Sequence, residues 1–373
     1  MSELKVDKVS PRTGNYVALN TVGMKNIIIN GDMSIAQRGT STSSVSTTQY
    51  PSLDRFQMYT QTAGSAVFTV SQDTDVPTGQ GFSKSQKIDV TTALDPYGAT
   101  NFTILRQRIE GQMLGYLKKG TSNAESLTLS FWVKSVKTGT YIVELYDNDN
   151  SRQISKSYTI DSASTWEKKT LTFAGDTSGS LTLDNSVAID LHFYLSVGSN
   201  YTSGTLNTSW NSVTTANRAV GQVNFADSAS NDFWITGVQL EAGTSASDFE
   251  FLPYDMNLQR CQRYYWQQIS SDSSTLRPVA VGSYIQNTYI EWTTQFPVQM
   301  RATPSLVSPT VTNGYEIYRA AAADSFNEVL LGNSTQYMAF LYNNTQVSGT
   351  GGQAGSIYCP NTYASSIAFS AEL

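Results

Sequence analysis

The chain has 373 residues, a formal net charge of −6, 14% charged residues and 11% aromatic residues. This weak acidic charge, without a run of lysine or arginine, argues against electrostatic binding of nucleic acid, and no apolar run approaches the roughly 18 residues of a membrane helix. The aromatic content argues against a disordered chain. The composition therefore indicates a globular, β-rich protein whose surface carries hydroxyl and amide groups.

The first 25 residues differ from the rest of the chain. They lack the apolar stretch of a signal peptide and have too few apolar residues to build a core. We expect 1–25 to be a docking segment that becomes ordered by adding to a partner's sheet, with a frayed terminus as the alternative. The residues expected to contact that partner are Leu4, Val6, Val9, Pro11 and Tyr16.

Apolar and polar residues alternate with a period of two through much of residues 26–255, which is typical of half-buried strands. The clearest runs are 127–134, 141–147 and 187–195, with shorter ones at 67–70, 87–90, 169–173 and 233–240. Residues 105–118 fit either a helix or a strand. Many short strands separated by turn signals predict a jelly-roll-type β-sandwich for this region.

A boundary is expected near residues 253–263. Pro253 closes a predicted strand at 249–252, and 255–263 is the best helical turn, with Asp255 as its N-cap. Strands are predicted again at 264–269, 279–285, 288–296, 315–319, 337–341 and 367–369. The sequence therefore predicts an all-β protein with a smaller C-terminal β domain over 256–373. We expect its polar loops to carry recognition, at 270–277, 327–336 and 343–355.

Ten short blocks follow one another along the chain: NIIINGDM (26–33), AQRGT (36–40), DRF (54–56), LRQRIE (105–110), SFWVK (130–134), VQLEAG (238–243), FE (249–250), CQRYY (261–265), FPVQMRATP (296–304) and AEL (371–373). With these blocks the chain resembles a family of tailed-bacteriophage structural proteins that form tail fibres or other virion appendages. Residues 4–14 also resemble short segments with which marine podovirus-like structural proteins attach to the particle.

The resemblance implies a virion protein, made in the host cytoplasm, that assembles as a homotrimer. It implies docking on another virion protein through the N-terminal segment, and attachment to a glycan or protein of the host surface through weak multivalent contacts. The alternative is a purely structural role, as a capsid decoration, head fibre or neck or tail adaptor.

Two of the blocks also have physical interpretations. Asn30-Gly31-Asp32 predicts a turn in which Gly31 has a positive φ. Arg38 is expected to pair with a carboxylate such as Asp54 or Glu241 and so tie a loop to the sandwich.

The alternation predicts a candidate glycan-binding face. If Leu129, Phe131, Val143, Leu145, Leu191 and Phe193 face the core, the intervening side chains face outward on one sheet. Aromatic rings stack on sugars, while carboxylates and amides bind sugar hydroxyls. The candidate residues are Trp132, Glu144, Tyr146, Asp190, His192 and Tyr194. The alternative is that this face packs against a neighbouring subunit or loop, with His192 a half-buried structural histidine.

No catalytic residue is expected. A glycosidase needs two carboxylates at a set separation, and Glu144 with Asp190 would qualify only if their strands are adjacent. A carbohydrate-active enzyme is therefore a minor alternative to a binding protein.

No metal and no cofactor are expected either. Residues 147–151 resemble a calcium loop, but Arg152 and Tyr158 stand where an EF-hand needs Gly and Glu, so a polar hairpin is preferred. Cys261 and Cys359 are too few for a disulfide framework or a four-cysteine zinc site.

Overall fold

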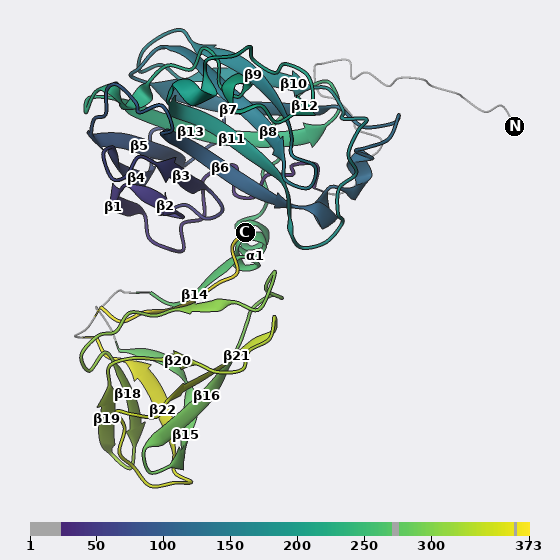
Figure 1. The fold of residues 1–373 in the computed structure, drawn as a ribbon. Coiled ribbons are helices and arrows are strands. Elements are labelled where there is room, and N and C mark those ends of the chain that lie inside the picture. Colours follow the sequence, from purple (N-terminus) through teal and green to yellow (C-terminus); the bar gives the residue numbers. More distant parts are fainter. Residues whose placement is uncertain (1–23, 271–275, 362–363) are drawn as a thin grey trace, which may run out of the picture.

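The computed structural model describes residues 24–270, 276–361 and 364–373, so the expected docking residues Leu4, Val6, Val9, Pro11 and Tyr16 lie outside the described residues. Two regions of antiparallel strands stand one above the other, joined at α1 (Tyr254–Gln262) (Figure 1). This confirms the predicted all-β class, a jelly-roll-type sandwich followed by a smaller β domain. In the described ranges, no helix is long and apolar enough to cross a membrane.

The sandwich consists of two sheets in which every paired strand is antiparallel. Sheet A has the order β1 (Ser41–Val45), β4 (Val67–Asp73), β5 (Ser85–Thr92), β13 (Asp232–Ala242), β7 (Leu127–Ser135) and β10 (Glu167–Phe173). Sheet B has the order β12 (Asn211–Ser212), β9 (Arg152–Ile160), β8 (Gly139–Asp147), β11 (Val187–Val197), β6 (Phe102–Glu110), β3 (Gln57–Gln61) and β2 (Thr47–Gln49).

The core lies between these sheets, and the predicted inward-facing residues all reach it. Phe131 of sheet A and Phe193 of sheet B are fully buried and meet edge to face, with ring centroids 5.1 Å apart. Leu129, Val143, Leu145 and Leu191 are also fully buried in the same cluster. Burial of apolar surface at roughly 25 cal/mol per Å² makes this layer the main source of stability of the sandwich.

The segment between β11 and β13 covers the outer face of sheet B. It contains three short 3-10 helices, η3 (Ser199–Tyr201), η4 (Thr215–Asn217) and η5 (Phe225–Asp227). Ala219 is fully buried in a second apolar cluster that includes Ile142 and Tyr194 on the outer face of the sheet. We call residues 198–222 the cover segment.

The ambiguous segment 105–118 divides between two structures. Its first part belongs to β6, and two single-turn helices follow, η1 (Gly111–Met113) and η2 (Gly115–Leu117). The predicted strand at 249–252 does not form. α1 begins at Tyr254 with Pro253 in the N-cap position, so Asp255 lies in the first turn instead of capping the helix.

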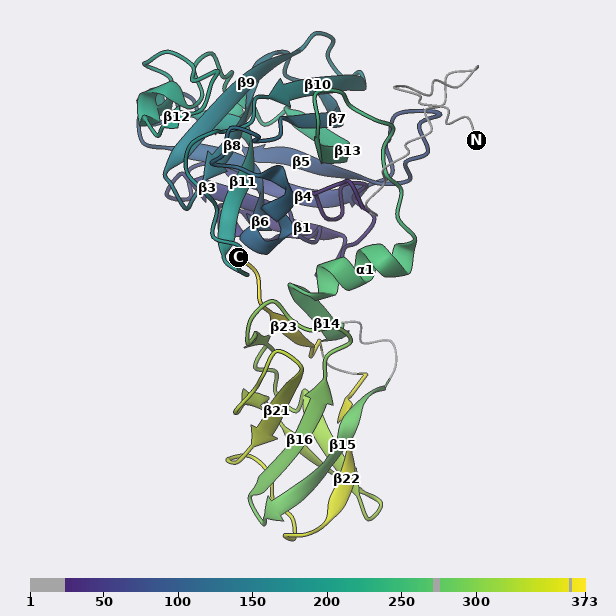
Figure 2. The same cartoon turned by 90° about the vertical axis from the view of Figure 1, so that its right-hand side faces the viewer.

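The C-terminal domain below α1 has two sheets (Figure 2). Sheet C has the order β14 (Tyr265–Ile269), β23 (Ile367–Ser370) and β17 (Ser305–Val307). Sheet D has the order β19 (Ala322–Phe326), β18 (Tyr315–Arg319), β22 (Ala354–Cys359), β15 (Arg277–Gln286), β16 (Tyr289–Gln295), β21 (Met338–Asn343) and β20 (Leu330–Leu331).

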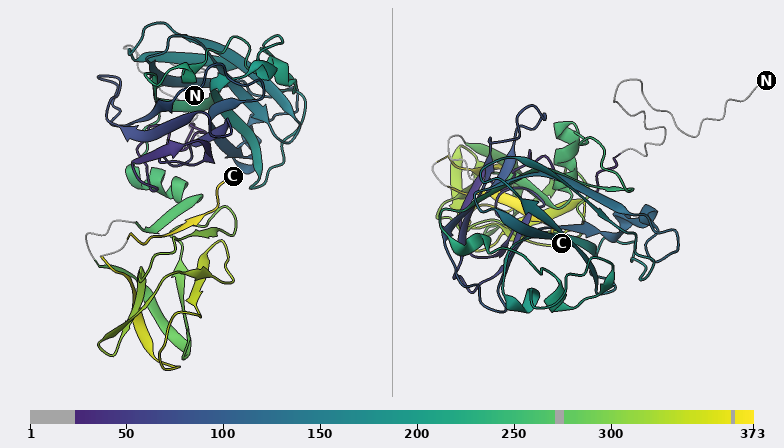
Figure 3. Two further views of the ribbon diagram at one scale, coloured as in Figure 1. Left: turned by 60° about the vertical axis from the view of Figure 1, so that its left-hand side comes forward. Right: turned by 90° about the horizontal axis from the view of Figure 1, so that it is seen from above.

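Several of the blocks meet where the two regions join, namely those that contain Arg38, Arg55, Tyr264, Tyr265 and Glu372. The C-terminal end of the chain lies there too (Figure 3). Glu372 binds both Arg38, at 3.0 Å, and Arg55, and all three side chains are largely buried. The two guanidinium groups lie over neighbouring rings, Arg38 over Tyr265 at 3.6 Å and Arg55 over Tyr264 at 3.5 Å. We call these five residues the junction cluster.

Further contacts extend the junction. Arg263 makes a bidentate pair with Glu110, at 2.9 and 2.8 Å. The Arg301 guanidinium donates to the backbone oxygens of Ala371 and Glu372, at 2.7 and 3.0 Å. The blocks that contain these residues thus connect the sandwich to the C-terminal domain.

The expected partners of Arg38 are correct only in part. Arg38 lies 3.8 Å from Asp54, but the closer carboxylate is that of Glu372. Glu372 could not be predicted from the local sequence because it is 334 residues away along the chain. Glu241 instead accepts hydrogen bonds from Gln239 on its own strand, β13, and from Ser247 in the loop that follows.

The positive φ predicted for Gly31 is wrong. Asn30 adopts the positive φ, at 62°, while Gly31 is needed for close approach, since a Cβ atom there would lie 2.1 Å from the backbone oxygen of Val238.

Candidate functional site

Five of the six candidate glycan residues come together on the outer face of sheet B. Glu144 and Tyr146 lie on β8 beside Asp190, His192 and Tyr194 on β11. The adjacency that the sequence could not establish is therefore present, since His192 pairs directly with Glu144 across the two strands.

These side chains form a buried ionic network. Glu144 accepts hydrogen bonds from Tyr194 at 2.9 Å and from Arg218 of the cover segment at 2.9 and 2.6 Å. His192 lies between two carboxylates, 2.9 Å from Glu144 and 3.5 Å from Asp190. We call this set, with Arg106 and Arg108 beside Asp190, the buried polar cluster.

The charges of the cluster keep both carboxyl groups ionised. Burial alone would raise the pKa of Glu144, but the Arg218 guanidinium and the hydrogen bond from His192 outweigh it and lower that pKa to about 2. For Asp190, the contacts with His192 and the two arginines likewise lower the pKa despite burial. Neither group has the raised pKa of a general acid.

The buried polar cluster is inaccessible to a sugar. Glu144 and Tyr194 are fully buried, while Asp190 and His192 are each 2% exposed. The prediction that these four residues face solvent is wrong. The cover segment packs on Glu144 and Tyr194, while Arg106 and Arg108 pair with Asp190 and the Tyr146 ring stacks beside His192. Only Tyr146 keeps partial exposure, and Arg218 lies 4.9 Å from its ring centre.

Trp132, the sixth candidate, lies on the other sheet. It is on β7 and points to the outer face of sheet A, away from the buried polar cluster. There it lines a hollow of about 330 Å³, which we call the Trp132 hollow. Its lining residues are Gly79, Gln80, Phe82, Ser130, Trp132, Lys168, Gly237, Asp248, Phe249 and Phe251.

An aromatic wall forms part of this hollow. Phe82 contacts both Phe249 and Phe251, each with ring centroids 5.1 Å away, and Phe251 is half exposed. Gly237 lets this wall approach β13: it has a φ of 62°, and a Cβ atom there would lie 2.6 Å from the Phe82 ring.

Polar groups accompany the aromatic rings. Lys168 on β10 stands directly opposite Trp132 on β7, and Ser130 lies two residues along the same strand. Gln80 and Asp248 come from the two loops that carry the aromatic wall. The hollow thus combines ring faces with an amine, a carboxylate, an amide and a hydroxyl, the pairing of apolar surface with a few polar groups that small-molecule sites use.

On the neighbouring surface of sheet A, the side chains pack against one another. Lys134 lies 4.0 Å from the centre of the Trp234 ring and 5.6 Å from that of Trp166. The indole nitrogen of Trp166 donates to Asp75 at 2.8 Å, which fixes that ring. This part of the sheet presents a packed surface beside the open Trp132 hollow.

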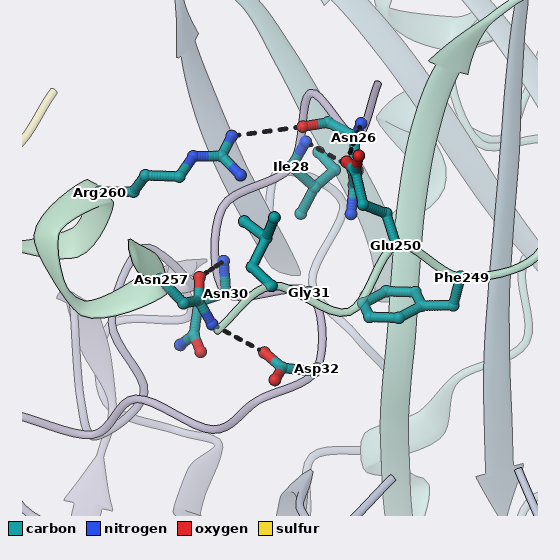
Figure 4. Close-up of a pocket in the computed structure, with 10 residues that line it drawn as sticks. Asn26, Ile28, Asn30, Gly31, Asp32, Phe249, Glu250, Asn257 and Arg260 are labelled. Atoms are coloured by element: carbon teal, nitrogen blue, oxygen red, sulfur yellow. Dashed lines mark hydrogen bonds between the residues drawn. The ribbon is translucent and has the colours of Figure 1, made fainter. Parts of the chain in front are cut away.

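A second small pocket, at the start of α1, is structural (Figure 4). Asn257 donates to Asp32 at 3.0 Å, and Arg260 donates to the Asn26 backbone oxygen at 3.2 Å. Its volume of about 10 Å³ is at the limit for one water molecule. These hydrogen bonds hold α1 against the turn at residues 30–32, and the pocket has no room for a sugar.

The possible calcium loop is a hairpin turn between β8 and β9, as preferred from the sequence. Asp147 is fully buried and binds the Lys119 ammonium group, which also contacts Asp176 at 3.0 Å and the Gly179 backbone oxygen at 2.8 Å. An amine thus occupies the centre of these oxygens. Among the described residues, no group of three or more His, Cys, Asp or Glu side chains could hold a metal ion.

Comparison with known proteins gives structural matches alone. No protein-family model and no curated protein matches the chain. The enzymatically active domain of bacteriophage CBA120 tailspike protein 4 matches with 17% identity and a TM-score of 0.31, covering 58% of this chain and 21% of that one. The aligned region therefore spans about a fifth of the tailspike chain.

Two carbohydrate-binding modules also match. A CBM4 module has 14% identity and a TM-score of 0.30, covering 57% of this chain and 97% of its own. The family 11 module from Clostridium thermocellum has 12% identity and a TM-score of 0.27, covering 56% and 98%. These matches concern the β-sandwich fold.

Proposed function

We propose that this protein is an appendage of a tailed-phage virion, most simply a tail fibre, that binds carbohydrate on the host surface through the Trp132 hollow. The observation that carries the binding proposal is the hollow itself, which places Trp132 beside an aromatic wall and four polar side chains. The virion part of the proposal rests on the resemblance of the sequence blocks.

The lining of the hollow suits a sugar because a pyranose ring has one apolar face and a rim of hydroxyl groups. Trp132 and Phe251 offer ring surface for the apolar face. Gln80, Lys168 and Asp248 offer donors and acceptors for the hydroxyls. A site this small and open binds weakly on its own, so attachment would depend on several copies acting together.

The protein is proposed to act by binding without catalysis. The two carboxylates that suggested a glycosidase, Glu144 and Asp190, are both buried and already occupied by ion pairs. Asp248 is the one carboxylate among the residues that line the Trp132 hollow, whereas glycoside hydrolysis ordinarily uses two.

A polysaccharide array tests this function. Full-length protein is applied to an array of bacterial surface polysaccharides, together with Trp132→Ala and a matched control, Trp166→Ala. Trp166 directly precedes β10 of the same sheet and lies outside the hollow. We expect the wild type and the control to bind the same glycans and Trp132→Ala to lose at least tenfold in signal. Equal binding by all three proteins would contradict the assignment of the site.

The array also distinguishes the fibre from the two alternative functions, a structural virion protein and an enzyme. A decoration or adaptor protein would bind no polysaccharide on the array and would bind assembled particles. Turnover of a polysaccharide during the incubation, detected as new reducing ends, would instead favour the enzyme.

The fibre proposal includes a homotrimer docked through residues 1–25. Light scattering on a sizing column tests the trimer, which would have three times the chain mass of 40.8 kDa. A monomer in solution would count against the fibre and favour an adaptor that assembles on the particle.

A further inference from the structure

The C-terminal domain has an open hollow of its own on the outer face of sheet D. It has a volume of about 330 Å³, similar to that of the Trp132 hollow, and lies where β16 and β21 pair. We call it the Phe340 hollow. The residues that line it are Thr293, Asn333, Thr335, Met338 and Phe340.

The Phe340 ring is held in a fixed position. It lies on the backbone of Gly332, where a Cβ atom would be 2.2 Å from the ring, and the Gly332 amide donates to the Phe340 backbone oxygen at 2.8 Å. Because one side of the ring packs on this glycine, the half-buried ring is pre-organised as an apolar platform in the hollow.

The rim of the hollow carries uncharged hydrogen-bonding groups. The Thr335 hydroxyl oxygen accepts from the amides of Tyr337 and Met338, at 3.1 and 3.3 Å, which leaves its proton to donate outward. Thr293 and Asn333 are exposed, and their side chains make no hydrogen bond with another described residue. A ligand can therefore bind all three groups without breaking a contact of the fold.

An aromatic row continues from the hollow along the same face. Phe340 stacks beside Tyr342, with ring centroids 6.1 Å apart, and Tyr342 meets Tyr289 edge to face at 5.8 Å. This row is long enough to contact more than one ring of an oligosaccharide.

The electrostatics of the hollow favour an uncharged ligand. Every lining residue is neutral. Residues 264–373 contain no lysine, and Glu291, across from Tyr342, is the charged side chain nearest the row in the strand register. An anionic polysaccharide would find no cation among the lining residues of this hollow, in contrast to the Trp132 hollow with its Lys168.

We propose that the Phe340 hollow is a second carbohydrate site, selective for neutral oligosaccharides. The ring platform takes the apolar face of a sugar, and the Thr293, Asn333 and Thr335 side chains bind its hydroxyls. With one site on each domain, a single chain could hold a polysaccharide at two points, which raises its apparent affinity without stronger contacts.

Methyl NMR of the full-length chain, labelled with 13C-methyl methionine, tests this site directly because Met338 lines the hollow. The probes are maltohexaose, cellohexaose and xylohexaose as neutral sugars, and hexa-galacturonate as an anionic one. The Met338 signal is assigned with Met338→Leu. We expect at least one neutral sugar to shift this signal in a saturable way and hexa-galacturonate to leave it unchanged.

Variants separate this site from the Trp132 hollow. Trp132→Ala should leave the Met338 titration unchanged, so that failure of either proposal is visible without the other. Asn333→Ala and Thr293→Ala, both at exposed positions, should each weaken binding about threefold to tenfold, as expected for loss of one hydrogen bond. Gly332→Ala should weaken it further by displacing the ring.

Three results would overturn the proposal. One is a Met338 signal that none of the neutral sugars shifts. Another is an equal response to hexa-galacturonate. The third is a Met338 signal that changes with protein concentration in the absence of sugar, which would make the hollow a contact between copies of the chain.

Discussion

At the scale of single residues, the outer face of sheet B shows how burial changes the role of a side chain. Glu144, Asp190 and His192 would suit a glycan site in solvent, but each is almost fully buried and already paired. The chemistry that suggested binding instead holds the cover segment on the sheet through Arg218.

The lowered pKa of Glu144 predicts a loss of stability in acid. The folded-state pKa is about 2, below the ordinary value of 4.5, so the stabilisation is complete above pH 4.5 and is lost as the pH falls toward 2. The size of the shift corresponds to about 3 kcal/mol. Urea unfolding of the wild type between pH 2.5 and 6 should show this loss, and Glu144→Gln should have a flatter profile. Parallel profiles would mean that Glu144 does not contribute.

At the scale of elements, the Lys119 ammonium group ties the β8–β9 hairpin to the loop after β10. Its side chain is 7% exposed and reaches Asp147, Asp176 and the backbone oxygens of Ser178 and Gly179. Removing this charge leaves two buried carboxylates close together, with Arg152 as the remaining partner of Asp176.

We therefore expect Lys119→Met to destabilise the protein by about 3–5 kcal/mol. The matched control is Lys118→Met, because Lys118 makes an exposed pair with Glu125 that should contribute less than about 1 kcal/mol. Calcium should partly restore Lys119→Met and leave the wild type unchanged, since oxygen ligands surround the vacated position. Thermal unfolding measures all three proteins, and equal midpoints for the two lysine variants would refute the role of Lys119.

At the scale of the whole molecule, the junction cluster joins the sandwich to the C-terminal domain. Its residues come from positions 38, 55, 264, 265 and 372, so the chain must complete both regions before the cluster forms. We expect the two regions to unfold together in one transition.

Glu372→Gln tests this connection because it leaves Arg55, whose side chain is 1% exposed, without its carboxylate. The expected loss is about 3–5 kcal/mol, with separation of the calorimetric peak into two. Glu328→Gln, on the surface of the same domain and outside the ion pairs of the described residues, should keep the wild-type trace. A single unshifted peak for Glu372→Gln would show that the cluster does not couple the regions.

Strands can be predicted from the local sequence, whereas their pairing depends on residues that are far apart in the chain. Strands such as β7, β8 and β11 could be predicted because the alternation of apolar residues reports burial directly. β9 was missed because its outward positions and part of its inner face are polar. The placement of Trp132 on a different sheet from Glu144 could not be predicted, because it depends on which distant strands pair.

The candidate sites show the same limit. Phe82, Phe249 and Trp132 lie in three separate stretches of sequence, and no motif brings them together before the sheet forms. The Phe340 hollow likewise depends on the pairing of Thr293 with Phe340 across β16 and β21, and on the packing of Gly332 against the Phe340 ring. The local signals were an aromatic residue on the polar side of a strand and, for the Phe340 hollow, the predicted polar loop 327–336, which contains Asn333 and Thr335.

The most direct test of the central claim is the 19F NMR spectrum of the full-length protein labelled with 5-fluorotryptophan, recorded with and without the polysaccharide that binds best on the array. The chain has six tryptophans, and each signal can be assigned by substitution. We predict that the Trp132 signal shifts on binding while that of Trp292, which is buried in the C-terminal domain, stays in place. An unchanged Trp132 signal in the presence of bound polysaccharide would contradict the account.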